Sequence, residues 1–246
     1  VGPQIKLAKR LSKLLPDNLQ SFYFLNSGSE AVEGAMKLAK KHTGRGKIVA
    51  MRNAYHGSTS GALSMMSDEY YSGPFKPLLP NIHFAELNEL ATLDIIDNQT
   101  AAVFIEPIQS EKGYIPVTQI FLNALRTKCN ETGTLLVFDE IQSGIGRTGK
   151  LYAFEHYNVV PDILLSAKAL GGGMPIGVFI SSKKIMDSLS DNPILGHITT
   201  FGGHPVSCAA GNAALKFLTK SSLMDEVAEK EALFRELLVH PKIKGI

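Results

Sequence analysis

Polar residues that could do chemistry follow several short apolar runs of the sequence. They are Asn26-Ser27-Gly28-Ser29, Glu106, the pair Asp139-Glu140, and Lys168, which comes two positions after Ser166. In an open α/β sheet, ligands bind beyond the carboxyl ends of the strands, so groups far apart in the chain can converge on one crevice. These residue types would give that crevice an anion-binding turn, buried carboxylates and an amine nucleophile.

Lys168 stands in "SAKALGGG", between an apolar run and three consecutive glycines. Ala169 and Leu170 beside it predict a desolvated amine, and desolvation favours the neutral form of a lysine. A neutral amine is the form that makes a Schiff base with an aldehyde. The alternative for this residue is a surface lysine that anchors a turn.

The stretch "NSGSE" predicts a strand-to-helix turn in which Ser27 and Glu30 form a capping box. The free backbone N–H groups of such a turn, together with the positive end of the helix dipole, bind phosphate. A plain serine-capped helix start is the alternative, and the two interpretations are compatible.

Asp139 follows the apolar run 135–138, so its carboxylate should be partly buried and should need a cationic partner. A protonated ring nitrogen on a cofactor would provide one, and a salt bridge with Arg147 is the alternative. Gln142 could reach the same place if the chain curls back after the strand. Tyr55, in "AYHG", could stack on a flat ring or could cap the core. A phosphate-binding turn, a carboxylate for a ring nitrogen, an aromatic side chain and a desolvated lysine together describe a pyridoxal-phosphate site.

The elements that must position these groups alternate between apolar, β-branched runs and helical patterns. This alternation is typical of an α/β domain with a mostly parallel sheet covered by helices on both faces. Helices are expected over 27–42, 119–133, 205–218 and 222–238, the second with Gly133 as its C-cap. The candidate strands, continuous apolar runs as expected for strands covered on both faces, span 21–26, 47–51, 101–107, 134–140, 162–166 and 177–181.

Composition excludes several other classes of protein. The net charge is +2 with dispersed basic residues, so we expect no nucleic-acid partner. Cys129 and Cys208 are the only cysteines, which leaves no disulfide framework and no paired-cysteine metal site, and favours a reducing, cytoplasmic location. No apolar run approaches the roughly 18 residues of a membrane helix, so we expect no membrane partner either.

The stretch "GIGRTGK", over 144–150, approximates two nucleotide-binding motifs. A dinucleotide fingerprint should open a helix and should have an acidic residue about 20 positions later, but position 169 is Ala. A P-loop should continue with Ser or Thr, and position 151 is Leu. A glycine-rich turn that reverses the chain explains these glycines better.

Six motifs, in order and spacing, resemble the class III (ω-amino-acid type) aminotransferases of the fold-type I pyridoxal-phosphate family. They lie between residues 26 and 211 and read "NSGSEAVEGAMKLAK", "AYHG", "IEPIQSEKGY", "LLVFDEIQSGIGRTG", "SAKALGGGMPIG" and "TTFGGHPVSCAAG". The acetylornithine/ornithine aminotransferase branch is the most similar.

The resemblance implies a role for each matching residue. Lys168 would hold the cofactor and shuttle a proton, and Asp139 would pair with the pyridine nitrogen. Gln142 would contact the phenolic oxygen of the cofactor, and Tyr55 would stack on the cofactor ring. Gly28 and Ser29 would bind the cofactor's phosphate, and Glu106 would support the cofactor end of the site. His56 and the gating Glu111 would contact the substrate. Thr200 would reach the phosphate bound in a neighbouring subunit, which implies a homodimer.

The implied reaction is a ping-pong transfer of an amino group from an (acetyl)ornithine-like or other ω-amino donor to a keto acid such as 2-oxoglutarate. An aminomutase of the same fold type is the alternative, and an ATPase built on "GIGRTGK" is a weaker one. The arginine that often follows "HG" in the family is replaced by Ser58. We expect residues 1–246 to be the large cofactor-binding domain of a longer chain that also has a small C-terminal domain and an N-terminal segment.

Overall fold

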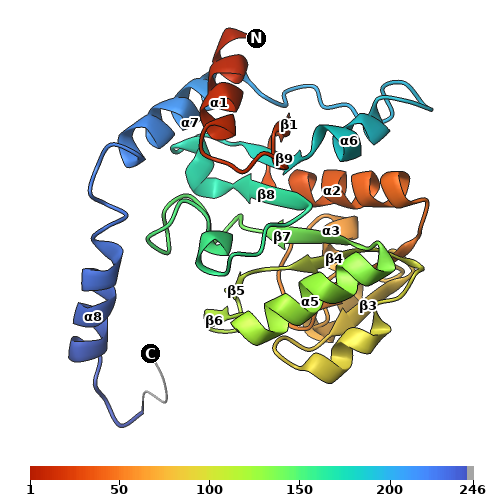
Figure 1. Cartoon of the computed structure of the whole chain (residues 1–246), viewed down its shortest axis with the longest axis horizontal. Helices are drawn as coiled ribbons and strands as arrows, with labels where there is room; N and C mark the ends of the chain where they lie inside the picture. Colours follow the sequence, from red (N-terminus) through yellow and green to blue (C-terminus); the bar gives the residue numbers. More distant parts are fainter. Residues whose placement is uncertain (243–246) are drawn as a thin grey trace.

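A seven-stranded sheet forms the centre of the protein, in the strand order β1-β9-β8-β7-β4-β2-β3 (Figure 1). The computed structural model describes residues 1–242. β9 pairs antiparallel with both of its neighbours, and the other pairs in this sheet are parallel. The predicted mostly parallel α/β sheet is therefore confirmed. The strands are β1 (Ser21–Leu25), β2 (Lys47–Met51), β3 (Ile82–Ala85), β4 (Thr100–Ile105), β7 (Leu135–Asp139), β8 (Ile163–Ala167) and β9 (Gly177–Ser181).

Every predicted strand range overlaps a strand of this sheet, because continuous apolar runs are what a sheet covered on both faces requires. Strand β3 was not predicted. It is a four-residue edge strand with a partly exposed pattern, so its apolar signal is weak. A small antiparallel hairpin was also missed, since its strands β5 (Ile108–Gln109) and β6 (Ile115–Pro116) have two residues each.

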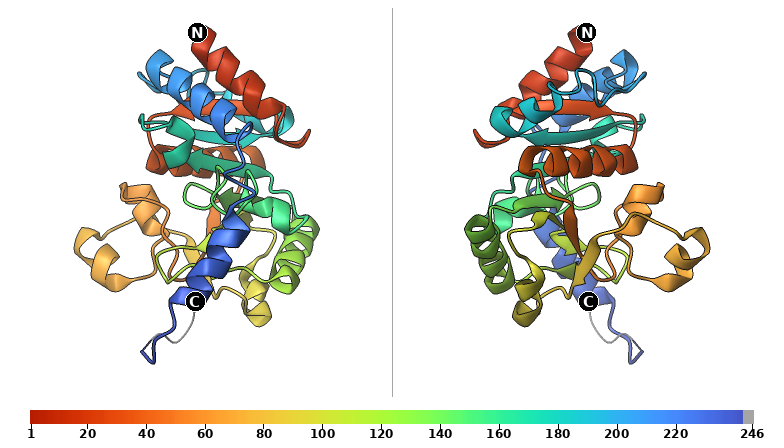
Figure 2. Two further views of the ribbon diagram at one scale, coloured as in Figure 1. Left: turned by 90° about the vertical axis from the view of Figure 1, so that its left-hand side faces the viewer. Right: turned by 90° about the vertical axis from the view of Figure 1, so that its right-hand side faces the viewer.

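The sheet separates two hydrophobic cores, and Figure 2 shows helices on both of its sides. In β7, Leu136 and Phe138 belong to one core, while Leu135 and Val137 belong to the other. The first core is completed by helices α1 (Gly2–Ser12), α5 (Gln119–Thr132) and α7 (Pro205–Leu218); the second is completed by α2 (Gly28–Thr43), α3 (Ser60–Ser64) and α6 (Lys183–Met186). Alternating strand residues thus bury both faces, as predicted.

Three of the predicted helices begin and end close to their expected limits. The predicted range 27–42 corresponds to α2, in which Ser27 is the N-cap and accepts a hydrogen bond from the Glu30 amide. The range 119–133 corresponds to α5, which ends at Gly133 in the left-handed conformation. The range 205–218 coincides with α7. Helix α1 was not predicted, because only Leu7 and Leu11 of its residues are buried.

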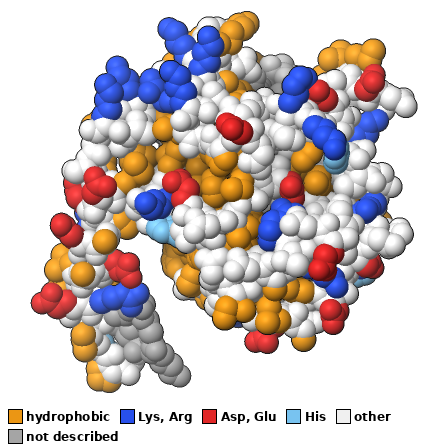
Figure 3. Space-filling model, in the orientation of Figure 1, with side chains coloured by type: hydrophobic (Ala, Val, Ile, Leu, Met, Phe, Trp, Pro, Cys, Tyr) orange, Lys and Arg blue, Asp and Glu red, His pale blue; other side chains and the backbone are white. Residues whose placement is uncertain are grey.

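The fourth predicted helix is shorter than expected. Helix α8 spans Val227–Leu237, whereas the prediction began at 222. None of its residues is buried, and Figure 3 shows hydrophobic side chains among the charged ones on this helix. Its Leu233, Phe234 and Leu237 are largely exposed apolar side chains.

Among the described residues, no helix is long and apolar enough to cross a bilayer. Short helical turns connect the main elements. These turns are α4 (Glu69–Ser72) and the 3₁₀ helices η1 (Gly73–Phe75), η2 (Leu90–Ile95), η3 (Ala153–His156), η4 (Lys168–Gly171) and η5 (Asp187–Leu189).

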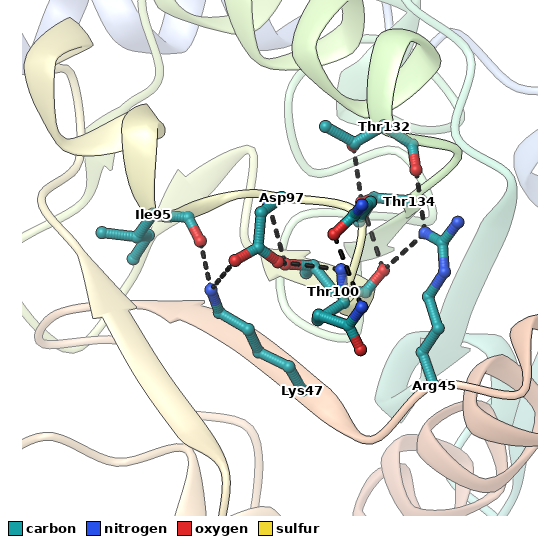
Figure 4. Close-up of polar contacts among 9 residues, drawn as sticks. Arg45, Lys47, Ile95, Asp97, Thr100, Thr132 and Thr134 are labelled. Carbon is teal, nitrogen blue, oxygen red and sulfur yellow. Dashed lines mark hydrogen bonds and ion pairs between the residues drawn. The ribbon is translucent and has the colours of Figure 1, made fainter.

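Polar contacts fasten the amino ends of strands β2 and β4 (Figure 4). The Arg45 guanidinium donates to the carbonyl oxygens of Thr100 at 3.0 Å, Thr132 at 2.8 Å and Gly133 at 3.1 Å. Lys47 pairs with Asp97 at 2.9 Å. This end of the sheet is occupied by structural contacts, while Glu106, just beyond the carboxyl end of β4, lines a cavity.

Candidate active site

A cavity of about 300 Å³ lies at the carboxyl ends of β4, β7 and β8, next to the start of α2. It brings together most of the residues that the sequence singled out, as expected for strand ends of one sheet. The predicted residues that line it are Gly28, Ser29, Tyr55, His56, Glu106, Asp139, Gln142 and Lys168.

The start of α2 forms one wall of this cavity. The Ser27 hydroxyl caps the Glu30 amide at 3.2 Å, so the amides of Gly28 and Ser29 have no acceptor within the helix. Glu30 reaches back to the backbone and side-chain nitrogens of Asn26, both at 2.9 Å, rather than to Ser27 as the predicted capping box would have it. The free amides and the helix dipole make this wall a site for an anion.

Gly57 lets the "YHG" turn approach that wall closely. Its φ is +129°, and a Cβ there would lie 2.2 Å from the Ser29 hydroxyl. Gly28 is confined in the same way, since a Cβ would lie 2.9 Å from the Ile141 side chain. Small residues at both positions keep open the space beside the free amides.

Asp139 is buried at the end of β7 and is held by two donors. Its Oδ2 lies 2.8 Å from His56 Nδ1, and its Oδ1 accepts a hydrogen bond from the Ile141 amide at 3.1 Å. The alternative salt bridge with Arg147 is wrong, because Arg147 lies exposed on the following loop and lines a different cavity. The carboxylate therefore has a fixed orientation within the chain itself.

His56 is also buried, and its charge is linked to that of Asp139. Burial alone would lower the pKa of His56, but the hydrogen bond and the charge of Asp139 outweigh burial and, with Glu106, raise the pKa. Its Nε2 is buried without a hydrogen-bond partner among the described residues. In this structure the buried His56 side chain contacts Asp139. Its implied contact with the substrate stays a prediction.

Glu106, just beyond β4, organises the opposite side of the cavity. Its carboxylate accepts from the Tyr55 amide at 3.2 Å and from the Ser110 hydroxyl at 3.0 Å. Burial raises the pKa of Glu106, the charge of Asp139 adds to the rise, and His56 opposes it. Glu106 thus ties the "AYHG" turn to the segment that follows β4.

Tyr55 opens to the cavity rather than to the core, since 36% of the residue is exposed. The alternative in which it caps the core is therefore wrong. Its hydroxyl lies 3.0 Å from the hydroxyl of Ser58, the residue that replaces the expected arginine. Its stacking on a ring stays a prediction.

Lys168 is not desolvated, which corrects the expectation drawn from Ala169 and Leu170. The residue is exposed, begins η4 and has a left-handed φ of +43°. Its Nζ donates to Gln142 Oε1 at 2.6 Å. Leu170 lies in the core and Ala169 packs against it, while Lys168 lines the open cavity.

Two predicted site residues lie outside this cavity. Glu111 lines a neighbouring cavity of about 490 Å³ that shares Tyr55. Thr200 is exposed and does not line the site in this chain, although Thr199 beside it accepts a hydrogen bond from Asn26 at 3.1 Å. Their roles stay predictions.

Several residues that line the cavity were not predicted. Ser110 lies in the small hairpin region, and its signal is its place in "EPIQSEKGY". Met174, Pro175 and Ile176 lie between the three glycines and β9. They are apolar residues of a loop, so their types alone gave no chemical signal.

The stretch "GIGRTGK" forms turns, as the glycine-rich alternative predicts. Gly146 and Gly149 have φ values of +86° and +85°, and only the short η3 follows. Leu151, at the position where a P-loop needs a hydroxyl, is buried in the core. Neither nucleotide motif has its required structural context.

Comparison with known proteins identifies the family of this chain. The sequence matches the family described as aminotransferase class-III over residues 2–244, so the chain belongs to this family. It is 45% identical to the [LysW]-aminoadipate semialdehyde/glutamate semialdehyde transaminase of Sulfolobus acidocaldarius, over 95% of this chain and 60% of that protein. It is 42% identical to the succinylornithine transaminase of Yersinia pestis, over 94% of this chain and 58% of that protein.

A solved structure of Toxoplasma gondii ornithine aminotransferase, whose title reports partial occupancy of PLP at the active site, is similar to this fold. Its TM-score is 0.90 at 30% identity, with 98% of this chain and 59% of that chain covered. This chain thus spans about 60% of the length of its curated relatives. The predicted family and fold type are confirmed.

Class-III aminotransferases use pyridoxal phosphate, and the residues of this cavity fit that cofactor. Free amides at Gly28 and Ser29 suit its phosphate, and the cradle kept open by Gly57 leaves room beside them. A buried carboxylate, Asp139, and an accessible amine, Lys168, suit its ring nitrogen and its aldehyde.

Proposed function

We propose that this chain carries the cofactor site of an aminotransferase that moves an amino group from an (acetyl)ornithine-like or other ω-amino donor to a keto acid such as 2-oxoglutarate. One observation supports this most directly. The amine of Lys168, the carboxylate of Asp139 and the first amides of α2 line a single cavity. The names of the relatives, which include succinylornithine and semialdehyde transaminases, favour an amino group at the far end of the donor.

Pyridoxal phosphate supplies an aldehyde that reacts with amines and a ring that takes up the electron pair of a deprotonated carbon. The amides of Gly28 and Ser29 would hold its phosphate, and the carboxylate of Asp139 would hold the proton on its ring nitrogen. With the cofactor bound, Lys168 Nζ would be the base that accepts a proton from the amine-bearing carbon of the substrate. Gln142 orients that amine through the contact at 2.6 Å.

The proposal includes a homodimer in which Thr200 completes the site of the neighbouring subunit. The segment around Thr200 exposes large apolar side chains, as an interface segment would. Those side chains are Ile194, Leu195, Ile198 and Phe201. Light scattering on wild type and on a Phe201→Asp variant tests this, since the variant should be monomeric.

Borohydride trapping tests the cofactor site. The chain is incubated with pyridoxal phosphate, reduced and digested, and the label should appear on the Lys168 peptide. The Lys168→Ala variant is the control and should carry no specific label. A wild-type chain that stays colourless and unlabelled contradicts the proposal.

A screen of amine donors tests the reaction. Ornithine, acetylornithine, succinylornithine and putrescine are each mixed with the cofactor-loaded protein, and release of a carbonyl product is measured. A transferase releases this product in stoichiometric amount and needs a keto acid to turn over. An isomerised amine formed without any keto acid would favour the aminomutase alternative.

A further inference from the structure

Glu140 follows Asp139 directly, yet its side chain does not line the cavity. It is fully buried, and its carboxylate accepts three hydrogen bonds. The donors are the amides of Ala153 at 2.6 Å and Phe154 at 2.8 Å, and the hydroxyl of Ser143 at 3.0 Å. A carboxylate at the end of β7 is therefore bonded to a segment thirteen and fourteen residues further along the chain.

The loop 141–152 leaves Glu140 and returns to it. Its near end is fixed by the Gly144 amide, which donates to the Glu140 carbonyl at 3.0 Å, and its far end by the carboxylate contacts. Within the loop, the Gly146 amide donates to the Leu151 carbonyl at 3.1 Å. Ile145 is held at a φ of +57°, a conformation that a β-branched residue rarely adopts. A loop with such strain persists only when surrounding contacts hold it in place.

Gln142 lies in this loop, inside the turn that the Gly144–Glu140 backbone hydrogen bond closes and next to Ser143, which donates to the Glu140 carboxylate. Its side-chain oxygen accepts the hydrogen bond from Lys168 Nζ at 2.6 Å. The position of that oxygen consequently depends on how the loop is closed. We propose that Glu140 is a positioning residue: its carboxylate closes the loop 141–152 onto the end of β7 and so holds Gln142 in contact with Lys168.

The electrostatic setting of Glu140 agrees with this role. Burial raises the pKa of its carboxyl to about 7, while the three donors oppose the rise. Burial of a carboxylate destabilises the folded state unless its oxygens accept hydrogen bonds. The charged form of Glu140 therefore depends on the hydrogen bonds from Ser143, Ala153 and Phe154. This proposal rests on the proposed function only where it treats Lys168 as a catalytic residue. Every contact that it uses lies within this chain.

The Glu140→Gln variant tests the closure of the loop. An amide has one acceptor oxygen, so its NH₂ group would face an N–H of Ala153 or Phe154. Amide hydrogen exchange should become about tenfold faster over 141–154, as expected for the loss of one buried hydrogen bond, and should not change in β4. The matched control is Glu155→Gln, an exposed residue that accepts from the Tyr152 amide at 2.8 Å in the same turn. It should leave exchange over 141–144 at the wild-type rate.

The reactivity of Lys168 tests the link to Gln142. Reductive methylation with formaldehyde and cyanoborohydride, read by mass on the Lys168 peptide as a function of pH, needs no cofactor. Glu140→Gln and Gln142→Ala should shift the pH profile in the same direction, and the double variant should match Gln142→Ala alone. Glu155→Gln should leave the profile unchanged.

A wild-type profile in Glu140→Gln or in Gln142→Ala overturns the proposal, and so do additive shifts in the double variant. If Glu140→Gln does not fold, Ser143→Ala takes its place, because it removes one donor and keeps two. That variant must then speed exchange over 141–154 and move the Lys168 profile in the same direction. Because neither measurement uses the cofactor, a failure here is distinct from a failure of the borohydride test.

Discussion

His56 Nδ1 lies 2.8 Å from Asp139 Oδ2, and the two side chains are 0% and 4% exposed. The contact joins the turn after β2 to the end of β7. Asp139 consequently has a charge partner within the chain, and its carboxylate is oriented before any ligand enters the cavity.

Removal of His56 should destabilise the protein, because it leaves Asp139 buried without its partner. We expect His56→Phe to lower the free energy of unfolding by about 3 kcal/mol, measured by urea denaturation. The control is His83→Phe, since His83 is exposed on β3 and its replacement should cost little. Equal losses of unfolding free energy in the two variants would show that the His56–Asp139 pair does not stabilise the protein.

Stability should depend on pH through the same pair. The raised pKa of His56 means that the folded chain binds the proton more tightly than the unfolded chain. This contribution is complete below about pH 6.5 and is lost as the pH rises through the higher folded-state pKa. The difference in unfolding free energy between wild type and His56→Phe should therefore narrow above about pH 6.5. A difference that widens with rising pH would contradict the assignment.

Gly57→Ala should weaken binding of pyridoxal phosphate by about tenfold or more, because the new Cβ would press on the Ser29 hydroxyl and strain the backbone. Absorbance titration with the cofactor measures this. Gly113→Ala is the matched control: its φ is +107° and a Cβ there meets nothing within 4 Å. It shares the backbone strain and should bind the cofactor as wild type does. Similar weakening in both variants would mean that strain, rather than the contact with Ser29, is responsible.

Arg45→Ala should affect stability and leave the site unchanged. Arg45 is half-buried, and its hydrogen bonds to three carbonyl oxygens lie at the amino ends of the strands. We expect a loss of about 1 kcal/mol in thermal or urea unfolding, with unchanged affinity for pyridoxal phosphate. A large drop in affinity would show that the two ends of the sheet are coupled.

The convergence of the site could be predicted from the sequence, because apolar runs mark strands and parallel strands end at one edge. Glu106, Asp139 and Lys168 each follow such a run, and the structure brings them into one cavity. The partner of Asp139 could not be predicted in this way. His56 is 83 positions away, and nothing in its type distinguishes it from the other histidines.

The environment of Lys168 was predicted wrongly for a related reason. Apolar neighbours in sequence do not fix the direction of a side chain, and the left-handed backbone at Lys168 leaves its amine in the cavity. Similarly, the charge pattern of 222–238 predicted a helix but not where it begins or that none of its residues is buried. These outcomes depend on tertiary contacts rather than on local pattern.

β9, the strand that runs antiparallel to its neighbours in the seven-stranded sheet, has a consequence for the order in which the protein folds. β1 is the first strand of the chain, and it pairs only with β9, the last, with Ser21 opposite Ser181 and Leu25 opposite Gly177. Such a distant pairing carries a large loop-closure entropy and forms slowly. The anion-binding turn starts immediately after Leu25, so during synthesis its supporting strand pair cannot form until residue 181 has been made. The wall of the pocket that this turn forms thus gains its supporting strand only after about three quarters of residues 1–246 have been made.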